Sequence, residues 1–424
     1  MFLTINTVLI YSSFIIQACF GFLVAYLVLL TIAASRAERR TKLQMGQPTI
    51  KFAILIPAHN EQRLLPDLLN SLSRQDYPPH LFEIHVVADN CTDQTAPIAQ
   101  TCGCNVHVRT APNHRGKGPA LQWLFERVRQ SSSKIDAILI LDADSIVNPD
   151  FLRIMAGHLQ RGEKVIQAYY AVRDPGSSWT SSLRFTAFTV LHYLRPLGRM
   201  VLGASAGLKG NGMVFSTEVF TRYPWSNSVT EDIELHMRLI LNGERVTFAP
   251  DALVMGEMPD TLANSESQHE RWERGRLEMR RQYVPSLAKK ISAEISAGHF
   301  KQAYVLFDAI MEHIIPPFAI MVGLNLVFLL VNLAILTLAG MFGGDRLSPF
   351  AFRLAIFNLL FSVLLLSGQV YYVITGLKLI HAKREIYKGL LYSPAYLAWK
   401  VLQYSRVAVK RDELEWVRTR RNGV

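Results

Sequence analysis

The chain has 424 residues, of which 50% are hydrophobic and 19% charged, and its formal net charge is +11. This composition excludes a disordered or fibrous protein, and the length accommodates one large globular domain together with membrane segments. The positive charge suits nucleic acid, an anionic membrane surface or a phosphorylated substrate, so charge alone does not choose among these partners.

The first apolar run, at residues 8–34, exceeds the roughly 20 residues that a helix needs to cross a bilayer. No Lys or Arg precedes this run, whereas Arg36, Arg39, Arg40 and Lys42 follow it closely. A signal peptide carries its positive charge before the apolar segment, so residues 1–45 indicate a membrane anchor with a basic flank. The positive-inside rule then places the N-terminus outside and the following chain in the cytoplasm.

Residues 46–285 are predicted to form a cytoplasmic α/β domain, because short apolar runs alternate there with helical patterns. The buried strands are FAILI (52–56), IHVVAD (84–89) and AILIL (137–141). The segments EQRLLPDLLNSLSRQ (61–75) and GPALQWLFERV (118–128) carry apolar residues at helical spacing. A strand followed by a helix, repeated along the chain, predicts a parallel sheet.

Acidic residues stand where these strands end, in AHNE (58–61), ADNCTD (88–93) and DADS (142–145). Ligands of open α/β sheets bind beyond the carboxyl ends of the strands, which makes Glu61 and Asp89 candidate binding residues. Asp142 and Asp144 are two residues apart and can share a divalent cation. A D-x-D sequence also occurs in ordinary solvated turns, so this motif is weak by itself.

The segment HRGKGPA (114–120) lacks the first glycine of a Walker loop, and no G-x-G-x-x-G follows the first strand. A phosphate-hydrolysing or dinucleotide-binding fold is therefore disfavoured. Lys117 can still pair with a diphosphate, although an exposed lysine at a helix start explains the residue equally simply.

Two further segments contain candidate site residues. Thr230, Glu231 and Asp232 precede IELHMRLI and indicate a helix N-terminus, where carboxylates are favoured. In KGNGMVF (209–215), Gly210 and Gly212 either form a turn that a ligand approaches closely or only shape the chain.

The motif QHERW (268–272) combines an amide, a guanidinium and an indole shortly before the chain becomes apolar. Arg271 can bind an anion with two parallel donors, Gln268 adds hydrogen bonds, and Trp272 offers a flat aromatic face. The alternative is a surface helix whose Trp packs into the core. Four arginines follow before the amphipathic segment 286–314, which we expect to lie along the membrane interface, namely Arg274, Arg276, Arg280 and Arg281.

Residues 315–380 are predicted to contain two more membrane helices, at 315–341 and 350–377, joined by a short loop that contains GGDR. Basic residues follow the last run, at Lys378, Lys383, Arg384 and Lys388, so residues 381–424 are predicted to be a cytoplasmic tail. The tail's later basic residues suit either anionic lipid or an ordinary solvated end, namely Lys410, Arg411, Arg418, Arg420 and Arg421. The four cysteines, Cys19, Cys91, Cys102 and Cys104, show neither zinc spacing nor a disulfide framework.

The motifs PAHNE, VVADNCTD, GKGPAL, DAD, TED and QHERW, in this order from residue 57 to 272, resemble the inverting family 2 glycosyltransferases. More narrowly, the pattern D, D-x-D, E-D, Q-x-x-R-W resembles the membrane-embedded branch with the cellulose, chitin and hyaluronan synthases and the ceramide glucosyltransferases. The resemblance implies a GT-A (Rossmann-like) fold and a nucleotide-diphosphate sugar donor, usually a UDP-sugar.

The resemblance also implies roles for individual residues. Glu61 and Asp89 would contact the base, Asp142 the ribose or uridine, and Lys117, Gln268 and Arg271 the diphosphate region. Asp144 would bind Mg²⁺ or Mn²⁺, and Asp232 would be the catalytic base. The acceptor would meet Glu231, Gly212 and Trp272. The family often has two consecutive aspartates where this chain has Ala88 and Asp89, which leaves the uridine preference open.

Three functions remain from the sequence. The leading one is transfer of a single UDP-hexose or UDP-N-acetylhexosamine sugar to a lipid or lipid-linked acceptor at the bacterial inner membrane, because three spans are fewer than polymer-secreting relatives have. The second is a processive polysaccharide synthase that assembles with further copies or an export partner. The third is a non-catalytic nucleotide-sugar sensor or scaffold. Nucleic acid is disfavoured, because the arginine clusters adjoin membrane segments and no binding module appears.

Overall fold

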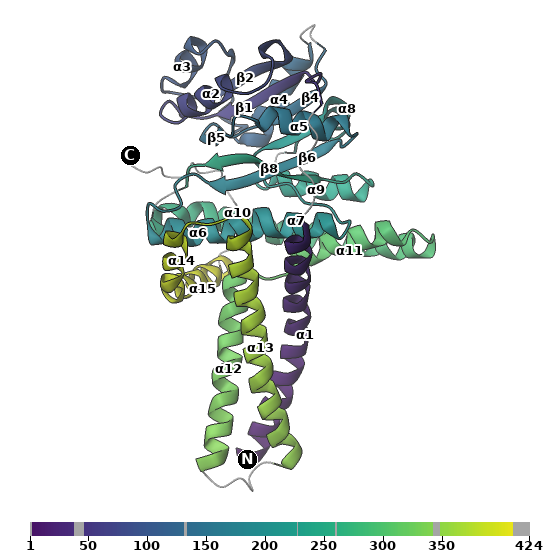
Figure 1. Cartoon of the computed structure of the whole chain (residues 1–424), viewed down its shortest axis with the longest axis vertical. Helices are drawn as coiled ribbons and strands as arrows, with labels where there is room; N and C mark the ends of the chain where they lie inside the picture. The colour runs from purple at the N-terminus through teal and green to yellow at the C-terminus, as the bar shows by residue number, and fades with distance from the viewer. Residues whose placement is uncertain are drawn as a thin grey trace.

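The computed structural model describes residues 2–37, 46–130, 134–226, 228–258, 261–341 and 348–409. An α/β domain stands on a layer of transverse helices, and three long helices extend from the other side of that layer (Figure 1). Several predictions made above fall outside the described residues. They concern Arg39, Arg40, Lys42, the GGDR loop (343–346) and the basic positions from Lys410 onward.

The sheet has eight strands in the order β3-β2-β1-β4-β7-β6-β8-β5. The strands are β1 (Phe52–Ala58), β2 (Phe82–Asp89), β3 (Asn105–Arg109), β4 (Ala137–Ile140), β5 (Ser145–Val147), β6 (Val165–Val172), β7 (Met213–Ser216) and β8 (Thr247–Gly256). The neighbours β3, β2, β1 and β4 are mutually parallel, as predicted. The α/β class is therefore confirmed, and the sheet flanked by helices agrees with the expected GT-A fold.

The expectation of a wholly parallel sheet is wrong for the half of the sheet that contains β7, β6, β8 and β5. β7 is antiparallel to both β4 and β6, and β5 is antiparallel to β8. The cause is the path of the chain after β6. It leaves that strand into helices of the transverse layer and enters β7 from the same end, so β7 must run in the opposite direction.

The helices of the α/β domain are α2 (Leu65–Ser73), α3 (Thr95–Thr101), α4 (Lys117–Gln130), α5 (Phe151–Gln160), α8 (Thr217–Arg222) and α9 (Glu231–Leu241). Alternation along β1 divides the core. Phe52, Ile54 and Ile56 belong to one buried cluster, whereas Ala53 and Leu55 belong to the other, because successive side chains of a strand point to opposite faces.

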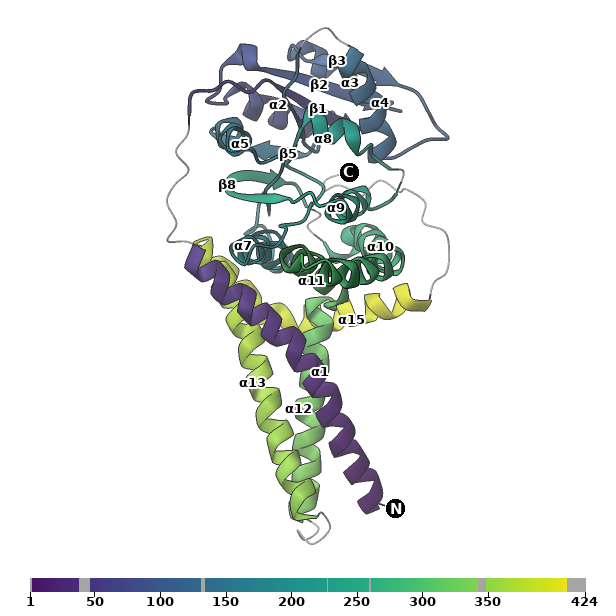
Figure 2. The same ribbon diagram turned by 90° about the vertical axis from the view of Figure 1, so that its right-hand side faces the viewer.

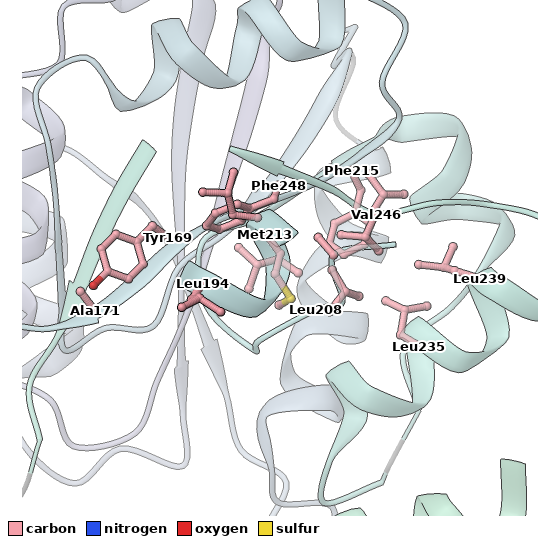
Figure 3. Close-up of a cluster of buried hydrophobic side chains, with 14 of the residues drawn as sticks. Tyr169, Ala171, Leu194, Leu208, Met213, Phe215, Leu235, Leu239, Val246 and Phe248 are labelled. Carbon is pink, nitrogen blue, oxygen red and sulfur yellow. The ribbon is translucent and has the colours of Figure 1, made fainter. Parts of the chain in front are cut away.

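The second of these clusters continues beneath the sheet toward α9. Leu235 and Leu239 project from α9 toward Phe215 of β7 and Val246, the residue before β8 (Figure 3). Because all four side chains are at most 2% exposed, this packing fixes the position of α9 relative to the sheet. The start of α9, which carries Glu231 and Asp232, is held in place with it.

The transverse layer contains α6 (Trp179–Thr189), α7 (Arg195–Val201), α10 (Leu262–Ser296) and α11 (Phe300–Ile314), with a π-helical turn at Val190–Leu194 between α6 and α7. The predicted boundary at residue 285 falls inside α10, at Pro285. The predicted tail contains α14 (Arg384–Gly389), a 3-10 turn (Leu390–Tyr392) and α15 (Ser393–Val409), which lies beside the layer in Figure 2.

The three long helices are α1 (Phe2–Ala37), α12 (Phe318–Met341) and α13 (Pro349–Leu379). Their segments Val8–Ala37, Phe318–Leu338 and Pro349–Leu379 are long and apolar enough to cross a membrane, as predicted. The N-terminus lies at the end of this bundle that is far from the α/β domain (Figures 1 and 2). The transverse layer therefore lies at the end of the candidate spans that adjoins the α/β domain.

Candidate active site

One cavity of about 800 Å³ lies beyond the carboxyl ends of β1, β2 and β4. Glu61, Asp89, Asp142 and Asp144 all line it, although they are far apart in the sequence. The strand-end residues therefore converge as the sequence predicted. Ala88, where the family pattern often has a first aspartate, is fully buried within β2.

Asp89 is held by its neighbours on one side. The guanidinium of Arg109, on β3, donates to Asp89 Oδ1 over 2.5 Å, and Asn90 Nδ2 donates to the same oxygen over 3.0 Å. The strand register pairs residue 89 with residue 109, so the ion pair follows directly from the parallel alignment of β2 and β3. Asp89 and Arg109 are 6% and 7% exposed, which gives the carboxylate a fixed direction at the cavity wall.

Lys117 joins the D-x-D motif to the glycine turn before β7. Its ammonium donates to the Asp142 carboxylate and to the Gly210 carbonyl. Burial lowers the pKa of Lys117, but Asp142 and Glu231 outweigh burial and leave the pKa above its ordinary value. Lys117 is thus a charged residue at the centre of the acidic group, which is where a diphosphate would need a cation.

Asn211, which the sequence analysis did not single out, fixes this arrangement. Its Oδ1 accepts from the Asp142 backbone N–H over 3.1 Å, and its Nδ2 donates to Ser145 Oγ over 2.7 Å. Gln167 Nε2 donates to the Asn211 carbonyl over 2.8 Å. Because Asn211, Gln167 and Ser145 are fully buried, the D-x-D turn has little freedom to move.

Glu231 and Asp232 form the first turn of α9 and line the cavity. A Cβ added at Gly210 would lie 3.3 Å from Asp232 Oδ2, and Gly210 has φ +79°. The glycine therefore lets the backbone come close to the carboxylate. Burial raises the pKa of both carboxyls, Asp232 raises that of Glu231 further, and Lys117 opposes the shift in each. A carboxylate with a raised pKa is a stronger proton acceptor.

Gln268, Arg271 and Trp272 line the cavity from α10. The ring of Trp272 also lies 6.2 Å from that of Phe188 and 5.6 Å from that of His269. The two interpretations of this tryptophan therefore hold together, because it packs against the core and faces the cavity. The helix can approach α9 closely because residue 275 is glycine, whose added Cβ would lie 2.3 Å from Thr230 Cγ2.

Gly212 is not among the described residues that line the cavity. It has φ +66°, and a Cβ there would lie 2.6 Å from Val254 Cγ1 and 2.9 Å from the Ala168 Cβ. The position needs glycine for packing inside the sheet, and the structure does not bring it to the site that we expected for an acceptor.

The cavity also extends to the candidate membrane spans and to α15. Phe318 and Val322 of α12 and Gln369 and Val373 of α13 line it, together with Tyr396, Lys400 and Tyr404 of α15. The sequence analysis missed the α15 residues. Their signal was an i, i+4, i+8 spacing, which places three side chains on one helix face.

The donor set suits a divalent cation that takes part of its ligands from a substrate. Asp142, Asp144 and Glu257 line the cavity, but Asp142 is paired with Lys117 and Glu257 with Arg63. Among the described residues there is no group of three His, Cys, Asp or Glu side chains that could hold a metal alone. Mg²⁺ and similar cations are commonly held by one or two carboxylates and by substrate phosphates, so these residues fit such an ion.

Comparisons with known proteins identify the family. The family model described as Glycosyltransferase like family 2 matches residues 48–275. The chain is 26% identical over 279 residues to YdaM of Bacillus subtilis, which is described as a probable glycosyltransferase. The aligned residues cover 62% of this chain and 65% of YdaM. It is 26% identical over 231 residues to the poly-beta-1,6-N-acetyl-D-glucosamine synthase of Staphylococcus aureus, covering 53% of this chain and 54% of that protein.

Among solved structures, the mannosyltransferase PcManGT from Pyrobaculum calidifontis, in complex with GDP-Man and Mn²⁺, matches with a TM-score of 0.48 and 17% identity. That match covers 86% of this chain and 98% of PcManGT. The chain covers less than two thirds of the length of both curated relatives.

Proposed function

The chain belongs to glycosyltransferase family 2, and on this premise we propose that it transfers a sugar from a UDP-sugar to a lipid or lipid-linked acceptor at the cytoplasmic surface of a membrane. Membership of the family makes the chain a glycosyltransferase, and inversion at the anomeric carbon is typical of the family. The donor, the acceptor and the membrane side are the proposed parts.

The continuity of one cavity carries the proposal. The same cavity is lined by Asp232 and Lys117 at the sheet and by Val322 and Val373 on two candidate membrane spans. A lipid that enters between the spans can therefore present its head to Asp232 without leaving the cavity. A site for a soluble acceptor would not need a wall made by these spans.

The donor is proposed to lie along the strand ends. Glu61 and Asp89 would contact the base, and Asp142 the ribose. Lys117, Gln268 and Arg271 would bind the diphosphate, where an ammonium and a planar guanidinium supply strong charge-assisted hydrogen bonds. A divalent cation held by Asp144 would neutralise the charge that builds on the departing diphosphate.

Asp232 is proposed to accept the proton of the acceptor hydroxyl as its oxygen attacks the anomeric carbon. The bond from that carbon to the diphosphate oxygen breaks as the new bond forms on the opposite face, which inverts the centre. The packing of α9 on the sheet keeps Asp232 from moving, and Glu231 and Trp272 would contact the acceptor or its sugar. The α10 residues that line the cavity would limit the access of water, which would otherwise compete with the acceptor.

A second candidate is a processive synthase of an envelope polysaccharide. The likeness to a protein named poly-beta-1,6-N-acetyl-D-glucosamine synthase supports it, and it favours an N-acetylhexosamine donor. A sensor without turnover is the remaining alternative. The complete set of Asp89, Asp142, Asp144, Asp232 and Arg271 at one cavity argues against it.

The test uses the full chain in detergent with native lipid extract, Mg²⁺ or Mn²⁺, and a panel of radiolabelled UDP-sugars. We expect one sugar to enter the organic phase, and Asp232→Asn to lower that rate by about 10²–10⁴-fold while UDP binding persists. Asp251→Asn, an exposed aspartate on β8, is the matched control and keeps full activity. Label in retained high-mass material would favour the synthase. UDP binding without turnover in any arm would favour the sensor.

A further inference from the structure

The part of the cavity lined by α6, α10 and residues 390–404 is hereafter called the α15 lobe. It adjoins the start of α12, because α15 packs against both α12 and α10. In Figures 1 and 2, α15 lies at the level where the spans meet the transverse layer. The lobe is therefore at headgroup height if the spans cross a membrane.

Positive charge is concentrated in the α15 lobe. Arg271 is assigned to the donor, and the other cationic lining residues are Arg184, Arg276 and Lys400. Glu273 is the acidic residue among the described lining positions of these segments. Glu273 already accepts from Tyr404 over 3.2 Å and pairs with Arg276 over 3.4 Å. Glu273 is therefore the charged partner of Arg276 within the lobe.

Lys400 is the clearest member of this group. It is 5% exposed, and no described carboxylate lies within the 4.0 Å of an ion pair. Its Nζ donates a hydrogen bond to the neutral amide of Gln403 over 3.3 Å and lies 5.3 Å from the ring of Trp399 and 5.4 Å from that of Tyr404. Ring faces attract an ammonium but supply no counter-charge.

His269 gives an independent indication of a ligand. It is 8% exposed, lines the cavity, and its Nε2 is buried without a hydrogen-bond partner among the described residues. Its ring lies 5.9 Å from that of Trp399, so it occupies the α10–α15 contact close to Lys400. Buried polar groups are normally hydrogen-bonded and buried charges normally paired. A single bound anion would give His269 Nε2 a hydrogen-bond partner and the Lys400 ammonium a counter-charge.

We propose that the α15 lobe binds the phosphate of an anionic lipid acceptor, with Lys400 supplying the charge and His269 a hydrogen bond. Basic pockets on the cytoplasmic side of membrane helices are suited to lipid phosphates. Burial lowers the pKa of Lys400 to about 8, with Glu273 opposing and Arg184 adding to the decrease, and a bound phosphate would stabilise the charged form.

The inference rests on the proposed function, because it specifies the chemical class of the lipid. The acceptor carries a phosphate that stays unchanged and a separate hydroxyl that reacts. The hydroxyl loses its proton to Asp232 and bonds to the anomeric carbon, and the nucleoside diphosphate leaves with the electrons of the broken bond. A lipid with a hydroxyl but no phosphate would lack the contact at the α15 lobe.

The test measures lipid retention and sugar transfer separately on the full chain. Short-chain phosphatidylglycerol is compared with phosphatidylcholine, diacylglycerol and soluble glycerol phosphate, and bound lipid is measured by native mass spectrometry. We expect phosphatidylglycerol to be retained best, and Lys400→Gln to weaken that retention by about tenfold while UDP affinity is unchanged. Lys400→Arg should retain the lipid.

Lys388→Gln, an exposed lysine on α14, controls for general attraction to an anionic surface and should have no effect. If Lys400→Gln does not fold, His269→Gln provides the second variant and should lower phosphatidylglycerol retention without changing UDP affinity. Equal retention of phosphatidylglycerol and phosphatidylcholine by the wild type would overturn the proposal. So would stronger retention of soluble glycerol phosphate, or a loss of UDP affinity in Lys400→Gln.

The two proposals fail in different ways. Lys400-dependent retention of phosphatidylglycerol without transfer of any sugar would support the phosphate subsite and remove the proposed function. Transfer to diacylglycerol that Lys400→Gln leaves unchanged would keep the proposed function and remove the subsite.

Discussion

The hydroxyl of Tyr26 donates a hydrogen bond of 2.5 Å to Asp308 Oδ1, which joins the first candidate span to α11. The other oxygen of Asp308 accepts from Arg199 Nε over 2.6 Å. Arg199 also pairs with Glu312, and Glu312 Oε1 accepts from Lys209 Nζ over 2.7 Å. A continuous set of polar contacts therefore runs from α1 to Lys209, which directly precedes Gly210, the residue whose backbone lies close to Asp232.

We expect Asp308→Asn to destabilise the chain by about 3 kcal/mol, because Asp308 and Arg199 are fully buried and Glu312 would be the one charged partner left to Arg199 among the residues that the structure describes. Tyr26→Phe should cost about 1–2 kcal/mol, as one hydrogen bond to a charged group is lost. Thermal unfolding in detergent measures both effects.

Tyr371→Phe is the control for the tyrosine, because Tyr371 is 42% exposed on α13 and should change nothing. The two substitutions act on one contact, so the double variant should be less unstable than the sum of the single effects. Full additivity would show that Tyr26 and Asp308 act independently.

The pH dependence of the reaction should reflect the raised pKa values of Glu231 and Asp232. A base must be deprotonated, so kcat/KM should rise with pH over a range above the ordinary carboxyl pKa of about 4. The groups that set this range are Lys117 on α4, Lys209 before β7 and Asp142 after β4. Initial rates at saturating metal across pH 4–9 would locate the acid limb.

Glu231→Gln removes the carboxyl whose pKa Asp232 raises, so the remaining acid limb should belong to Asp232 alone and should stay above the ordinary carboxyl pKa, because Asp232 remains buried. As pH rises, the contribution of this carboxyl pair to the free energy of unfolding should fall while activity increases. The folded pKa values exceed the unfolded ones, so the contribution of this pair is full below about pH 4 and is lost as pH rises through the folded values. An acid limb near pH 4 in the wild type would contradict the prediction.

Local sequence patterns were sufficient to predict the strands and helices in the first half of the α/β domain. The buried residues of α4, such as Leu121, Leu124 and Val128, lie on the face that their spacing predicted. The convergence of Glu61 and Asp89 followed from the general rule for parallel strands. These results depend only on periodicity and strand ends, which a single sequence contains.

Features that depend on distant contacts could not be predicted. The direction of β7 is set by the path through the transverse layer, which has no local signal. Gly212 and Gly210 are both glycines with positive φ in one turn, yet one faces Val254 and the other Asp232. The role of Lys400 needed the position of α15 against α10 and α12, and in the sequence this lysine is one of many basic residues near a span.

Asp144→Asn should weaken divalent-cation binding in the presence of UDP. The remaining protein carboxylates nearby are engaged by Lys117 and Arg63, so substrate oxygens would have to hold the ion almost alone. We expect at least about a tenfold increase in the Mn²⁺ concentration for half-saturation, measured by the loss of the free Mn²⁺ resonance. Asp251→Asn should not alter it. An unchanged curve in Asp144→Asn would assign the ion to other residues.

The contact between α10 and α9 provides the last prediction. A Cβ at residue 275 would lie 2.3 Å from Thr230 Cγ2 and 2.9 Å from Thr230 Oγ1. Gly275→Ala should therefore push α10 away from the start of α9, although alanine stabilises a helix by about 1 kcal/mol relative to glycine. Because α10 carries Gln268, Arg271 and Trp272, the displacement should lower kcat by about tenfold or more while UDP binding falls less.

A second substitution makes this interpretation specific. Thr230→Ala removes both atoms that clash, and Thr230 Oγ1 has no hydrogen-bond partner among the described residues, so the double variant Thr230→Ala with Gly275→Ala should regain most of the lost rate. Gly176→Ala, where an added Cβ meets nothing within 4 Å, controls for the general effect of the substitution. If Gly275→Ala retains the full rate, or if Thr230→Ala brings no recovery, the spacing of α9 and α10 does not control the reaction.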